Sequence, residues 1–336
     1  MKVCHFIASK GLGRGEAYID LVNALCAHIE IVLLVPKGSL FLGRVDDRVR
    51  VVEYRSKDSR SNLFLLYEIY LQIKKNQPDI VHTHFGKATQ IYYRINKFLK
   101  LPHVATKHNP RKGKIFNRLN NVIAVSEGVK QSIDHQDVTV IYNGISVRAI
   151  NEVTSVAEDK AFKICAVGRL DKIKGFDLLI KEVARLDFEF ELKIVGEGDE
   201  RKNLQELINE LNIGDKVKLL GFRMDIPELL SGADLQVMSS RSEGFSLAMV
   251  EAVFYSKVLI STNVGGSNEI LSPGLIISEF EIYEKVKDVY NNYKLYLDEF
   301  TFIKNKYKDH LNITTCAHAH FLYYEEILTG TQGAVS

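Results

Sequence analysis

Short apolar runs alternate with amphipathic segments along nearly the whole 336-residue chain, and this alternation constrains the fold more than any other feature. A helical pattern at 63–75, closed by Pro78, stands among apolar runs at 3–8, 29–36, 80–86, 104–109, 121–126 and 138–144. Consecutive parallel strands need a crossover helix, and a sheet covered on both faces has strands that are apolar throughout. The pattern therefore predicts an α/β fold with a doubly wound parallel sheet.

A second series of the same kind follows a polar stretch at 146–161 that lacks any apolar period. Its apolar runs are 162–168, 190–196, 216–222, 233–239 and 257–262. A domain usually has roughly 100–200 residues, so the length also favours two domains. We predict two Rossmann-like domains, at 1–150 and 151–330, with the linker in the polar stretch.

The net charge of +2 conceals a separation of charge between the two halves. Residues 1–150 hold 23 Lys and Arg against 12 Asp and Glu, whereas the remaining residues carry a net charge of −9. Nine basic residues and no acidic residue lie at 80–126, the first being Lys87 and the last Arg118. We predict that 87–118 docks on an anionic partner such as a membrane surface, with an ordinary solvated face as the alternative.

Cysteine and histidine positions give little support to a metal site. The four cysteines are scattered without a C-x-x-C pair, which predicts neither a disulfide framework nor structural zinc. His82 and His84 alternate on a predicted strand, but no third ligand stands at a suitable spacing, so we predict a structural role and no metal. No apolar run approaches the roughly 18 residues of a membrane span, and no signal peptide is evident, so we expect a cytoplasmic protein.

The first loop carries three glycines, Gly11, Gly13 and Gly15, before a helical pattern. A dinucleotide fingerprint would need glycine where Glu16 stands, and no acidic residue ends the second strand, so NAD binding is disfavoured. A glycine turn before a helix can still bring backbone amides to an anion, although a plain tight turn explains the same residues.

Charged residues follow several strands of the second series. Arg169 and Lys174 lie just after 162–168, at the carboxyl edge where open α/β sheets bind ligands, and two cations there suit a diphosphate. A solvent-facing loop of mixed charge is the alternative. Gly265, Gly266 and Glu269 follow 257–262 at the same edge.

The segment 240–254 gives the sharpest signal, because Glu251 is embedded in an apolar helix eight residues after Glu243. A buried carboxylate must be hydrogen-bonded in the core or reach a ligand's hydroxyl groups. The backbone amides near Ser246 would direct the positive end of that helix at phosphates. His108, at a strand end, is a candidate for contacting a sugar or an ordinary loop histidine. No D-x-D pair occurs, so a metal-held diphosphate is not indicated.

The ordered set of motifs strongly resembles glycosyltransferase family 4, also called glycosyl transferases group 1. The motifs that carry the resemblance lie at 80–85, 124–130, 140–145, 167–180, 194–201, 221–222, 240–252 and 264–270. The resemblance implies a GT-B fold, in which two Rossmann-like domains face an interdomain cleft and the last helix returns to the first domain. It also implies that the C-terminal domain holds a nucleotide-sugar donor, the N-terminal domain holds the acceptor, and the anomeric configuration is retained without a required metal.

Residue by residue, the resemblance implies a catalytic set of Arg169, Lys174, Glu243 and His108. Arg169 and Lys174 clamp the diphosphate, Glu243 contacts the donor sugar, Glu251 contacts the ribose, and His108 meets the transferred sugar. The donor-binding set that it implies is Gly13, Gly15, Arg169, Lys174, Phe222, Glu243, Gly244, Phe245, Ser246, Leu247, Glu251, Gly265, Gly266 and Glu269.

We therefore expect a hexosyltransferase that moves a hexose or N-acetylhexosamine from a nucleotide sugar, UDP-linked by family frequency, to a growing cell-envelope glycan. The acceptor would be a glycan or glycolipid, as in lipopolysaccharide core or polysaccharide assembly, at the inner face of the cytoplasmic membrane. No nucleic-acid partner and no cofactor besides the donor are expected. A GT-B nucleotide-sugar epimerase and a non-catalytic sugar-binding relative are the alternatives.

Overall fold

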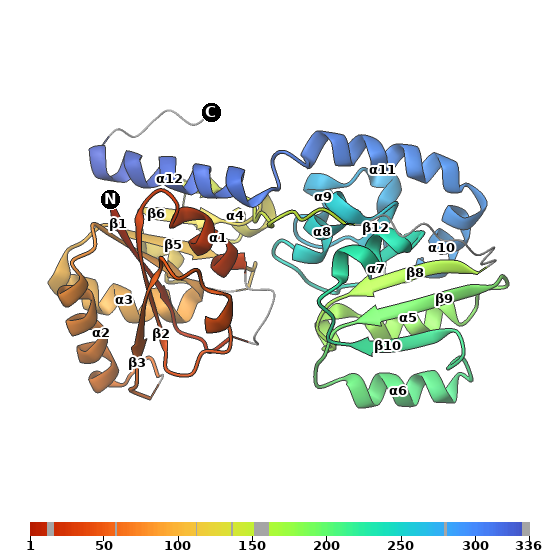
Figure 1. Cartoon of the computed structure of the whole chain (residues 1–336), viewed down its shortest axis with the longest axis horizontal. Helices are drawn as coiled ribbons and strands as arrows, with labels where there is room; N and C mark the ends of the chain where they lie inside the picture. The colour runs from red at the N-terminus through yellow and green to blue at the C-terminus, as the bar shows by residue number, and fades with distance from the viewer. Residues whose placement is uncertain are drawn as a thin grey trace. The chain divides into compact units, whose positions relative to one another are not determined.

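The computed structural model of the chain divides into two compact units (Figure 1). Unit 1 comprises Met1–Ser146 with His310–Ser336, and unit 2 comprises Val147–Asp309. The predicted bounds were 1–150 and 151–330, and the structure moves residues 310–330 from the second domain to unit 1, which is the return of the last helix that the resemblance implied. The residues described are 1–11, 17–57, 59–111, 113–135, 137–150, 161–278 and 281–330.

Among these residues, unit 1 holds a seven-stranded parallel sheet in the order β3-β2-β1-β4-β5-β6-β7. Its strands are β1 (Lys2–Ile7), β2 (Glu30–Pro36), β3 (Arg50–Tyr54), β4 (Ile80–His84), β5 (His103–Lys107), β6 (Asn121–Ala124) and β7 (Val138–Val140). Its helices are α1 (Ala17–Leu25), α2 (Leu63–Asn76), α3 (Phe85–Leu99), α4 (Glu127–Lys130) and α12 (Ile313–Thr329), with 3₁₀ turns η1 (Leu42–Arg44) and η2 (Phe116–Arg118).

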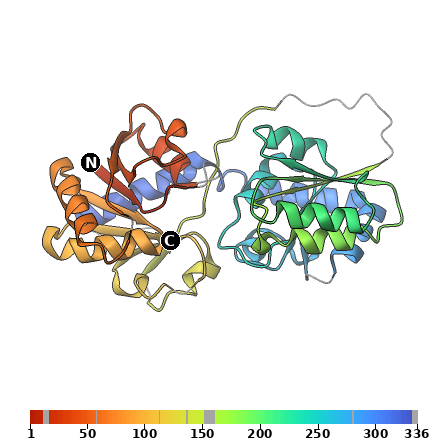
Figure 2. The same cartoon turned by 90° about the horizontal axis from the view of Figure 1, so that it is seen from below.

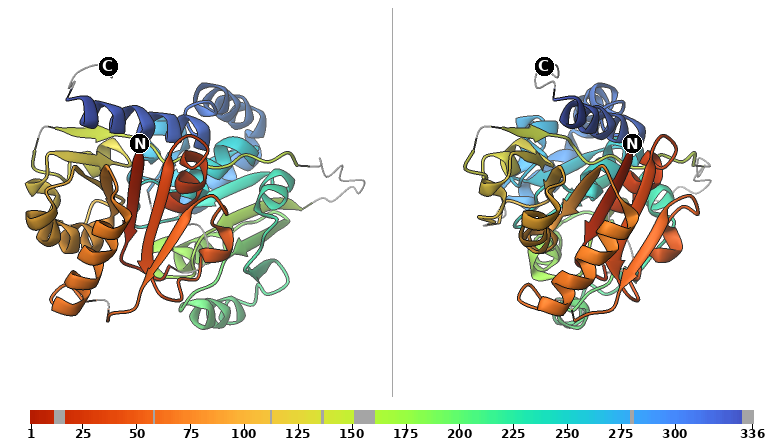
Figure 3. Two further views of the ribbon diagram at one scale, coloured as in Figure 1. Left: turned by 60° about the vertical axis from the view of Figure 1, so that its left-hand side comes forward. Right: turned by 90° about the vertical axis from the view of Figure 1, so that its left-hand side faces the viewer.

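Helices cover both faces of the unit 1 sheet. One face packs on α2 and α3 through side chains such as Phe6, Leu65 and Ile91. The other face packs on α1 and α12 through side chains such as Ile7 and Tyr324, so the last helix of the chain belongs to unit 1. Figures 2 and 3 show α12 lying along this unit. Strands buried on both faces explain why they appear as apolar runs in the sequence.

Two details of unit 1 differ from the sequence prediction. The apolar run 80–86 is not all strand, because β4 ends at His84 and α3 begins at Phe85, whose φ of +65° turns the chain sharply. The edge strand β3 was not predicted, because only Tyr54 of its five residues is fully buried and the run is not uniformly apolar.

Unit 2 holds a six-stranded parallel sheet in the order β10-β9-β8-β11-β12-β13 within the described residues. Its strands are β8 (Phe162–Val167), β9 (Phe190–Val195), β10 (Val217–Gly221), β11 (Leu235–Met238), β12 (Leu259–Thr262) and β13 (Ile276–Ile277). Its helices are α5 (Phe176–Val183), α6 (Arg201–Glu210), α7 (Ile226–Gly232), α8 (Leu247–Tyr255), α9 (Ser267–Ile270), α10 (Ile282–Asn291) and α11 (Tyr293–Tyr307), with 3₁₀ turns η3 (Lys172–Lys174) and η4 (Pro273–Leu275).

Both sheets reverse their strand order at one point, between β1 and β4 in unit 1 and between β8 and β11 in unit 2. Open α/β sheets bind ligands outside the carboxyl ends of the strands at such a switch point. We therefore expect ligand sites at the loops that follow β8 and β11 and at the carboxyl ends of β1 and β4.

Candidate active site

The loop after β8 is held in a defined shape by its own side chains. Asp171 caps η3, since its carboxylate accepts hydrogen bonds from the backbone N–H groups of Ile173 and Lys174, both at 3.1 Å. Gly175 follows with a φ of +65°, and a Cβ there would lie 2.1 Å from the carbonyl oxygen of Ser239. Only glycine allows this turn to approach the loop after β11 so closely. The position of Lys174 is fixed as a result.

Lys174 and Glu243 meet at the switch point of unit 2. The Lys174 ammonium lies 2.6 Å from Oε1 of Glu243, and both side chains are largely buried, at 16% and 15% exposure. The Ser240 hydroxyl donates to the same carboxylate oxygen at 2.8 Å, and the Ser239 hydroxyl donates to the Lys174 carbonyl at 3.0 Å. A pair shielded from water in this way interacts more strongly than an exposed pair.

Arg169 occupies a different environment from Lys174. Its side chain is exposed, and its guanidinium pairs with the Asp171 carboxylate at 3.0 Å. Arg241, which sequence reasoning did not select, makes a bidentate ion pair with Asp177 at 2.8 and 2.9 Å and donates to the Lys172 carbonyl at 2.7 Å. Arg241 thus ties the loop after β11 to η3 and α5. In the sequence, Arg241 could have been selected because it lies inside the segment 240–254.

The first turn of α8 carries a buried polar atom without a partner. Ser246 stands at the N-cap of α8 and is almost completely buried, yet its hydroxyl has no hydrogen-bond partner in the part of the chain that the structure describes. Burying such a group unsatisfied costs about 1–3 kcal/mol. The N-terminal amides of a helix also lack intrahelical partners and attract anions. A polar, negatively charged group at this end of α8 would satisfy both the hydroxyl and the amides.

The two glycines after β12 let their loop lie against the loop that carries Glu243. A Cβ at Gly265 would lie 2.5 Å from the Glu243 carbonyl oxygen, and a Cβ at Gly266, where φ is +82°, would lie 2.6 Å from the Phe245 ring. Glu269 is half-buried in the short helix α9, where its carbonyl accepts a hydrogen bond from Tyr307. The structure thus brings Lys174, Glu243 and both glycines together, as the sequence predicted.

The remaining donor-set residues are more dispersed. Glu251 is half-buried in the second turn of α8, and its charge, added to the larger effect of burial, raises the pKa of Cys165 on β8 to about 12. Phe222 follows β10 and is exposed. Gly244 is buried and Leu247 is half-buried beside Ser246. Gly13 and Gly15 lie outside the described residues.

His108 belongs to unit 1, where it lines a small pocket. The side chains around this pocket include Tyr18, His84, Thr106 and His320. His108 Nε2 lies 3.1 Å from Nδ1 of His84, and burial lowers the pKa of His108 to about 3. The ring is therefore neutral at neutral pH, with one nitrogen that donates and one that accepts.

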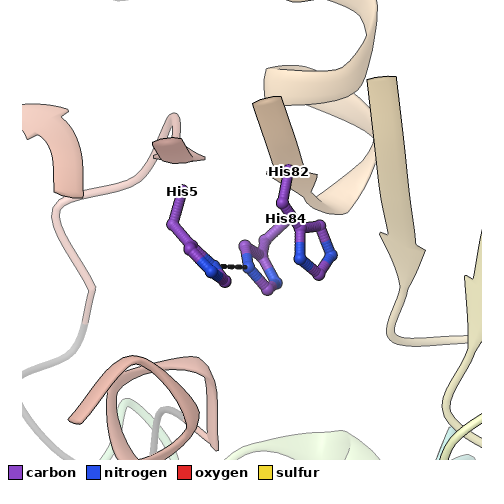
Figure 4. A group of neighbouring side chains, drawn as sticks. All are labelled: His5, His82 and His84. Carbon is purple, nitrogen blue, oxygen red and sulfur yellow. Dashed lines mark hydrogen bonds between the residues drawn. The ribbon is translucent and has the colours of Figure 1, made fainter. Parts of the chain in front are cut away.

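Sequence reasoning found no third histidine beside His82 and His84, but the structure places His5 next to them (Figure 4). His5 on β1 is the register partner of His82 on β4, so the two side chains share one face of the sheet. A pairing between strands that are 77 residues apart leaves no local spacing in the sequence. Positions of His in two adjacent predicted strands were the only available signal.

The prediction that the basic segment 87–118 lies on a docking surface was wrong for Lys107. Lys107 is 2% exposed, and its ammonium donates to the carbonyl and hydroxyl oxygens of Ser132 at 3.0 and 2.7 Å. It lies inside unit 1 because β5 is a central strand, so it cannot belong to a docking surface.

Across the described residues, no helix combines the length and apolar character needed to cross a bilayer.

The chain matches two family models and several known proteins. The model of Glycosyltransferase Family 4 matches residues 15–148, and that of Glycosyl transferases group 1 matches 148–299. An uncharacterized glycosyltransferase of Methanocaldococcus jannaschii is 28% identical over 315 residues, with 83% of this chain and 88% of the relative covered. The lipopolysaccharide core biosynthesis glycosyltransferase LpsE of Rhizobium meliloti is 23% identical over 283 residues, with 82% of each covered.

Among solved structures, that of Anabaena HepE in complex with UDP-glucose superposes with a TM-score of 0.84 at 19% identity, covering 96% of this chain and all of the other. The two parallel-sheet α/β units thus match a glycosyltransferase-type GT-B structure, and the predicted fold class is confirmed. With one family model on each half of the molecule, the chain belongs to the group 1 glycosyltransferases.

Proposed function

We propose that this glycosyltransferase is a retaining, metal-independent enzyme that moves a hexose or N-acetylhexosamine from a UDP-sugar to a hydroxyl group of a growing cell-envelope glycan. One observation carries the proposal: the Lys174–Glu243 pair and the unpartnered Ser246 hydroxyl occupy adjoining loops at the switch point of unit 2. Cation, carboxylate and helix N-terminus together suit a sugar diphosphate, which is anionic at one end and rich in hydroxyl groups at the other.

The UDP donor and the lipopolysaccharide-type acceptor are supported by the relatives. HepE was solved with UDP-glucose, and LpsE is described as a lipopolysaccharide core enzyme. The absence of a D-x-D pair in the sequence favours charge neutralisation by Arg169 and Lys174 instead of a divalent ion.

In the proposed mechanism, the bond between the sugar C1 and the phosphate oxygen breaks while the acceptor oxygen forms its bond to C1 on the same face. The proton of the acceptor hydroxyl moves to the departing phosphate oxygen, so no protein nucleophile is required. Lys174 has three N–H donors and spends one on Glu243, so it can also donate to phosphate oxygens. A cation fixed in place before the reaction stabilises the developing charge without reorganisation.

The experiment is a transfer assay with a panel of UDP- and GDP-sugars and lipopolysaccharide core acceptors, run with EDTA. We expect transfer from a UDP-sugar that EDTA does not reduce, and a product whose anomeric configuration, read by NMR, equals that of the donor. Inversion of configuration or loss of transfer in EDTA would contradict the proposal. Sugar interconversion without any acceptor would instead identify an epimerase.

For the acceptor, we propose that unit 1 docks on an anionic membrane surface through α2. This helix exposes Leu63, Phe64, Tyr67 and Leu71, of which Phe64 is 82% exposed, and their spacing puts them along one face. Lys74 and Lys75 stand in its last turn. Arg94 of α3 donates to the carbonyl of Arg60, so a further cation lies beside the start of α2. Apolar side chains flanked by cations suit the headgroup region of an anionic bilayer.

A vesicle co-sedimentation assay tests this docking. The double variant Phe64→Ser with Tyr67→Ser should bind phosphatidylglycerol vesicles less well than the natural chain, which should itself bind less as salt is added. The matched control is Leu295→Ser with Phe302→Ser, which removes two exposed apolar side chains from α11 of unit 2. Equal loss in both variants would argue against α2 as the docking helix.

A further inference from the structure

The inner face of the unit 1 sheet carries a polar strip where apolar side chains are the rule. His5 on β1, His82 and His84 on β4, and Thr106 on β5 are each at most 2% exposed. They project onto the face covered by α12, among core residues such as Val3 and Ile80. Burial of a polar group in such a core is costly unless it is hydrogen-bonded. A strip of this kind needs a reason beyond packing.

The histidines satisfy one another in a continuous chain of hydrogen bonds that starts at the pocket. His108 Nε2 meets His84 Nδ1 at 3.1 Å, and His84 Nε2 meets His5 Nδ1 at 3.0 Å (Figure 4). His5 Nε2 lies 3.5 Å from the hydroxyl of Tyr324 on α12, which is the longest link. The same hydroxyl meets His82 Nδ1 at 2.6 Å, and His82 Nε2 meets the Thr106 hydroxyl at 2.6 Å.

His5, His82 and His84 each use both of their ring nitrogens, and that makes the hydrogen bonds directional. A neutral imidazole has one N–H donor and one acceptor nitrogen. Burial and the neighbouring rings lower the pKa of His5, His82 and His84, which keeps them neutral. If His84 accepts from His108, it must donate to His5, and the reverse also holds. The direction of one bond therefore fixes the direction of the next.

The consequence appears at the pocket, where His108 has one nitrogen that does not face His84. When His108 donates to His84, its Nδ1 is an acceptor and can receive a hydrogen bond from a ligand hydroxyl. When His84 donates to His108, Nδ1 carries the proton and becomes a donor. Thr106, at the other end of the chain, lines the same pocket. The buried chain thus sets the hydrogen-bonding character of a pocket side chain.

A metal ion is a weaker explanation for the same cluster. The ligand atoms of His5, His82 and His84 lie within 4.8 Å of one another, which is near enough to surround an ion. However, both nitrogens of His82 are held by hydroxyls, and the His5–His84 bond would have to break. Within the described residues, the hydrogen-bond partners of these three rings are other imidazoles and hydroxyls and no carboxylate, so a divalent charge would be buried uncompensated.

We propose that His84 and His5 are positioning residues that decide which ring nitrogen of His108 carries the proton at the pocket. The kinetic part of this proposal rests on the proposed function, in which His108 contacts the transferred sugar. The tautomer of His108 is a property of unit 1 alone and is measurable without any substrate.

The test uses the full chain labelled with ¹⁵N-histidine, because two-bond ¹H–¹⁵N correlations distinguish the two neutral tautomers. We expect His5, His84 and His108 to show one tautomer each in the natural protein. His5→Phe keeps a ring in the stack beside His84 but removes both hydrogen bonds, so His84 and His108 should each become a mixture of tautomers. His5→Gln supplies a donor and an acceptor again and should restore a single tautomer at His108.

In the transfer assay, His5→Phe should lower kcat about tenfold at an unchanged KM for the donor, since a His108 ring in the wrong tautomer loses a hydrogen bond to the transferred sugar that counts in the transition state. His5→Gln should recover most of it. An unchanged His108 tautomer in folded His5→Phe protein would overturn the proposal whatever the activity. Failure of the transfer assay with every donor would bear on the proposed function and not on the relay.

Tyr324→Phe is the second variant, for use if His5→Phe does not fold. It removes only one oxygen atom from the hydrogen-bonded chain. It should alter the tautomers of His5 and also of His84, whose hydrogen bonds go to His5 and His108 and not to that oxygen. A change confined to His82 would overturn the relay. Addition of Co²⁺ completes the test. One equivalent bound by the natural chain, with a tetrahedral absorption spectrum that His5→Phe loses, would show a metal site and overturn the proposal.

Discussion

The two units place their polar side chains at the same point of the same topology, yet they use opposite chemistry. At the switch point of unit 2, a largely buried ion pair lies beside an unpartnered hydroxyl. At the switch point of unit 1, neutral imidazoles are buried in the core. All ten histidines of the chain fall within 1–146 and 310–336, and none falls in unit 2. Topology therefore selects the location of a site, and the residues select what it can bind.

The largest expected effect is a difference in acid sensitivity between the units. Burial lowers the pKa of His5, His103 and His108 to about 3 and that of His320 to about 4. The unfolded chain binds protons on these rings below about pH 6.5, whereas the folded chain does not bind them until about pH 3 to 4. The free energy of unfolding therefore decreases as the pH is lowered from about 6.5. One such ring costs about 2 kcal/mol at pH 5. Because several of these rings are neighbours, their contributions do not add in full. We expect the free energy of unfolding of unit 1 to fall by several kcal/mol in total.

Unit 2 should keep its stability over the same range. The pKa of Asp177 is lowered by its hydrogen bonds to Arg241, so its contribution is present above about pH 4 and is lost only below that value. Hydrogen exchange read by mass spectrometry, corrected for the intrinsic pH dependence, measures each unit separately. Unit 1 should lose protection between pH 6.5 and 5 while unit 2 does not. Equal losses would show that the buried histidines do not control acid unfolding.

Replacement of Lys174 tests the charged site of unit 2 directly. Lys174→Ala should raise the barrier to transfer by about 2.7–4 kcal/mol, a loss of roughly 10²–10³ in kcat, if the ammonium is a charge donor fixed in place. The control is Lys172→Ala, which removes an exposed cation from the same 3₁₀ turn. Turnover that survives in Lys174→Ala, or falls equally in both variants, would remove the clamp from the mechanism.

Replacement of one glycine in each unit tests how tightly the loops of the two units are packed. Gly175 in unit 2 and Gly38 in unit 1 have φ values of +65° and +75°, so alanine costs about 1–2 kcal/mol of backbone strain at either position. The Cβ at Gly175 would also overlap the Ser239 carbonyl, whereas nothing lies within 4 Å at Gly38. Overpacking adds about 1–3 kcal/mol. Urea unfolding should therefore find Gly175→Ala the less stable variant, and equal losses would deny the close approach of the two loops.

The same comparison shows what the sequence could and could not predict. The β–α alternation was visible because buried parallel strands are apolar throughout, and the Lys174–Glu243 neighbourhood was visible because both residues follow strands of one sheet. The exposed edge strand β3 and the turn at Phe85 carry no such signal. The histidine chain was missed because it joins β1, β4 and a helix 242 residues beyond His82. Contacts across that separation depend on strand order and on where α12 packs, which local patterns do not record.

The smallest expected effect distinguishes Ser126, which caps its helix, from Ser246, which we propose binds a ligand. Ser126 of unit 1 accepts a hydrogen bond from the Val129 N–H at 3.1 Å, so Ser126→Ala should lose about 1 kcal/mol of stability. Ser246 makes no such cap, so Ser246→Ala removes a buried unsatisfied hydroxyl and should leave the free energy of unfolding unchanged or raise it by about 1 kcal/mol.

Ser246→Ala should nevertheless weaken UDP-sugar binding by about 0.5–1.5 kcal/mol, the net value of one hydrogen bond, as read by isothermal titration calorimetry. Stability and binding would then change in opposite directions at one atom. That divergence is what a ligand-binding hydroxyl predicts, because its unsatisfied state is tolerated for the sake of its partner. Loss of stability with unchanged donor affinity would make Ser246 an ordinary helix cap and would leave the Lys174–Glu243 pair as the remaining support for a donor site at this end of α8.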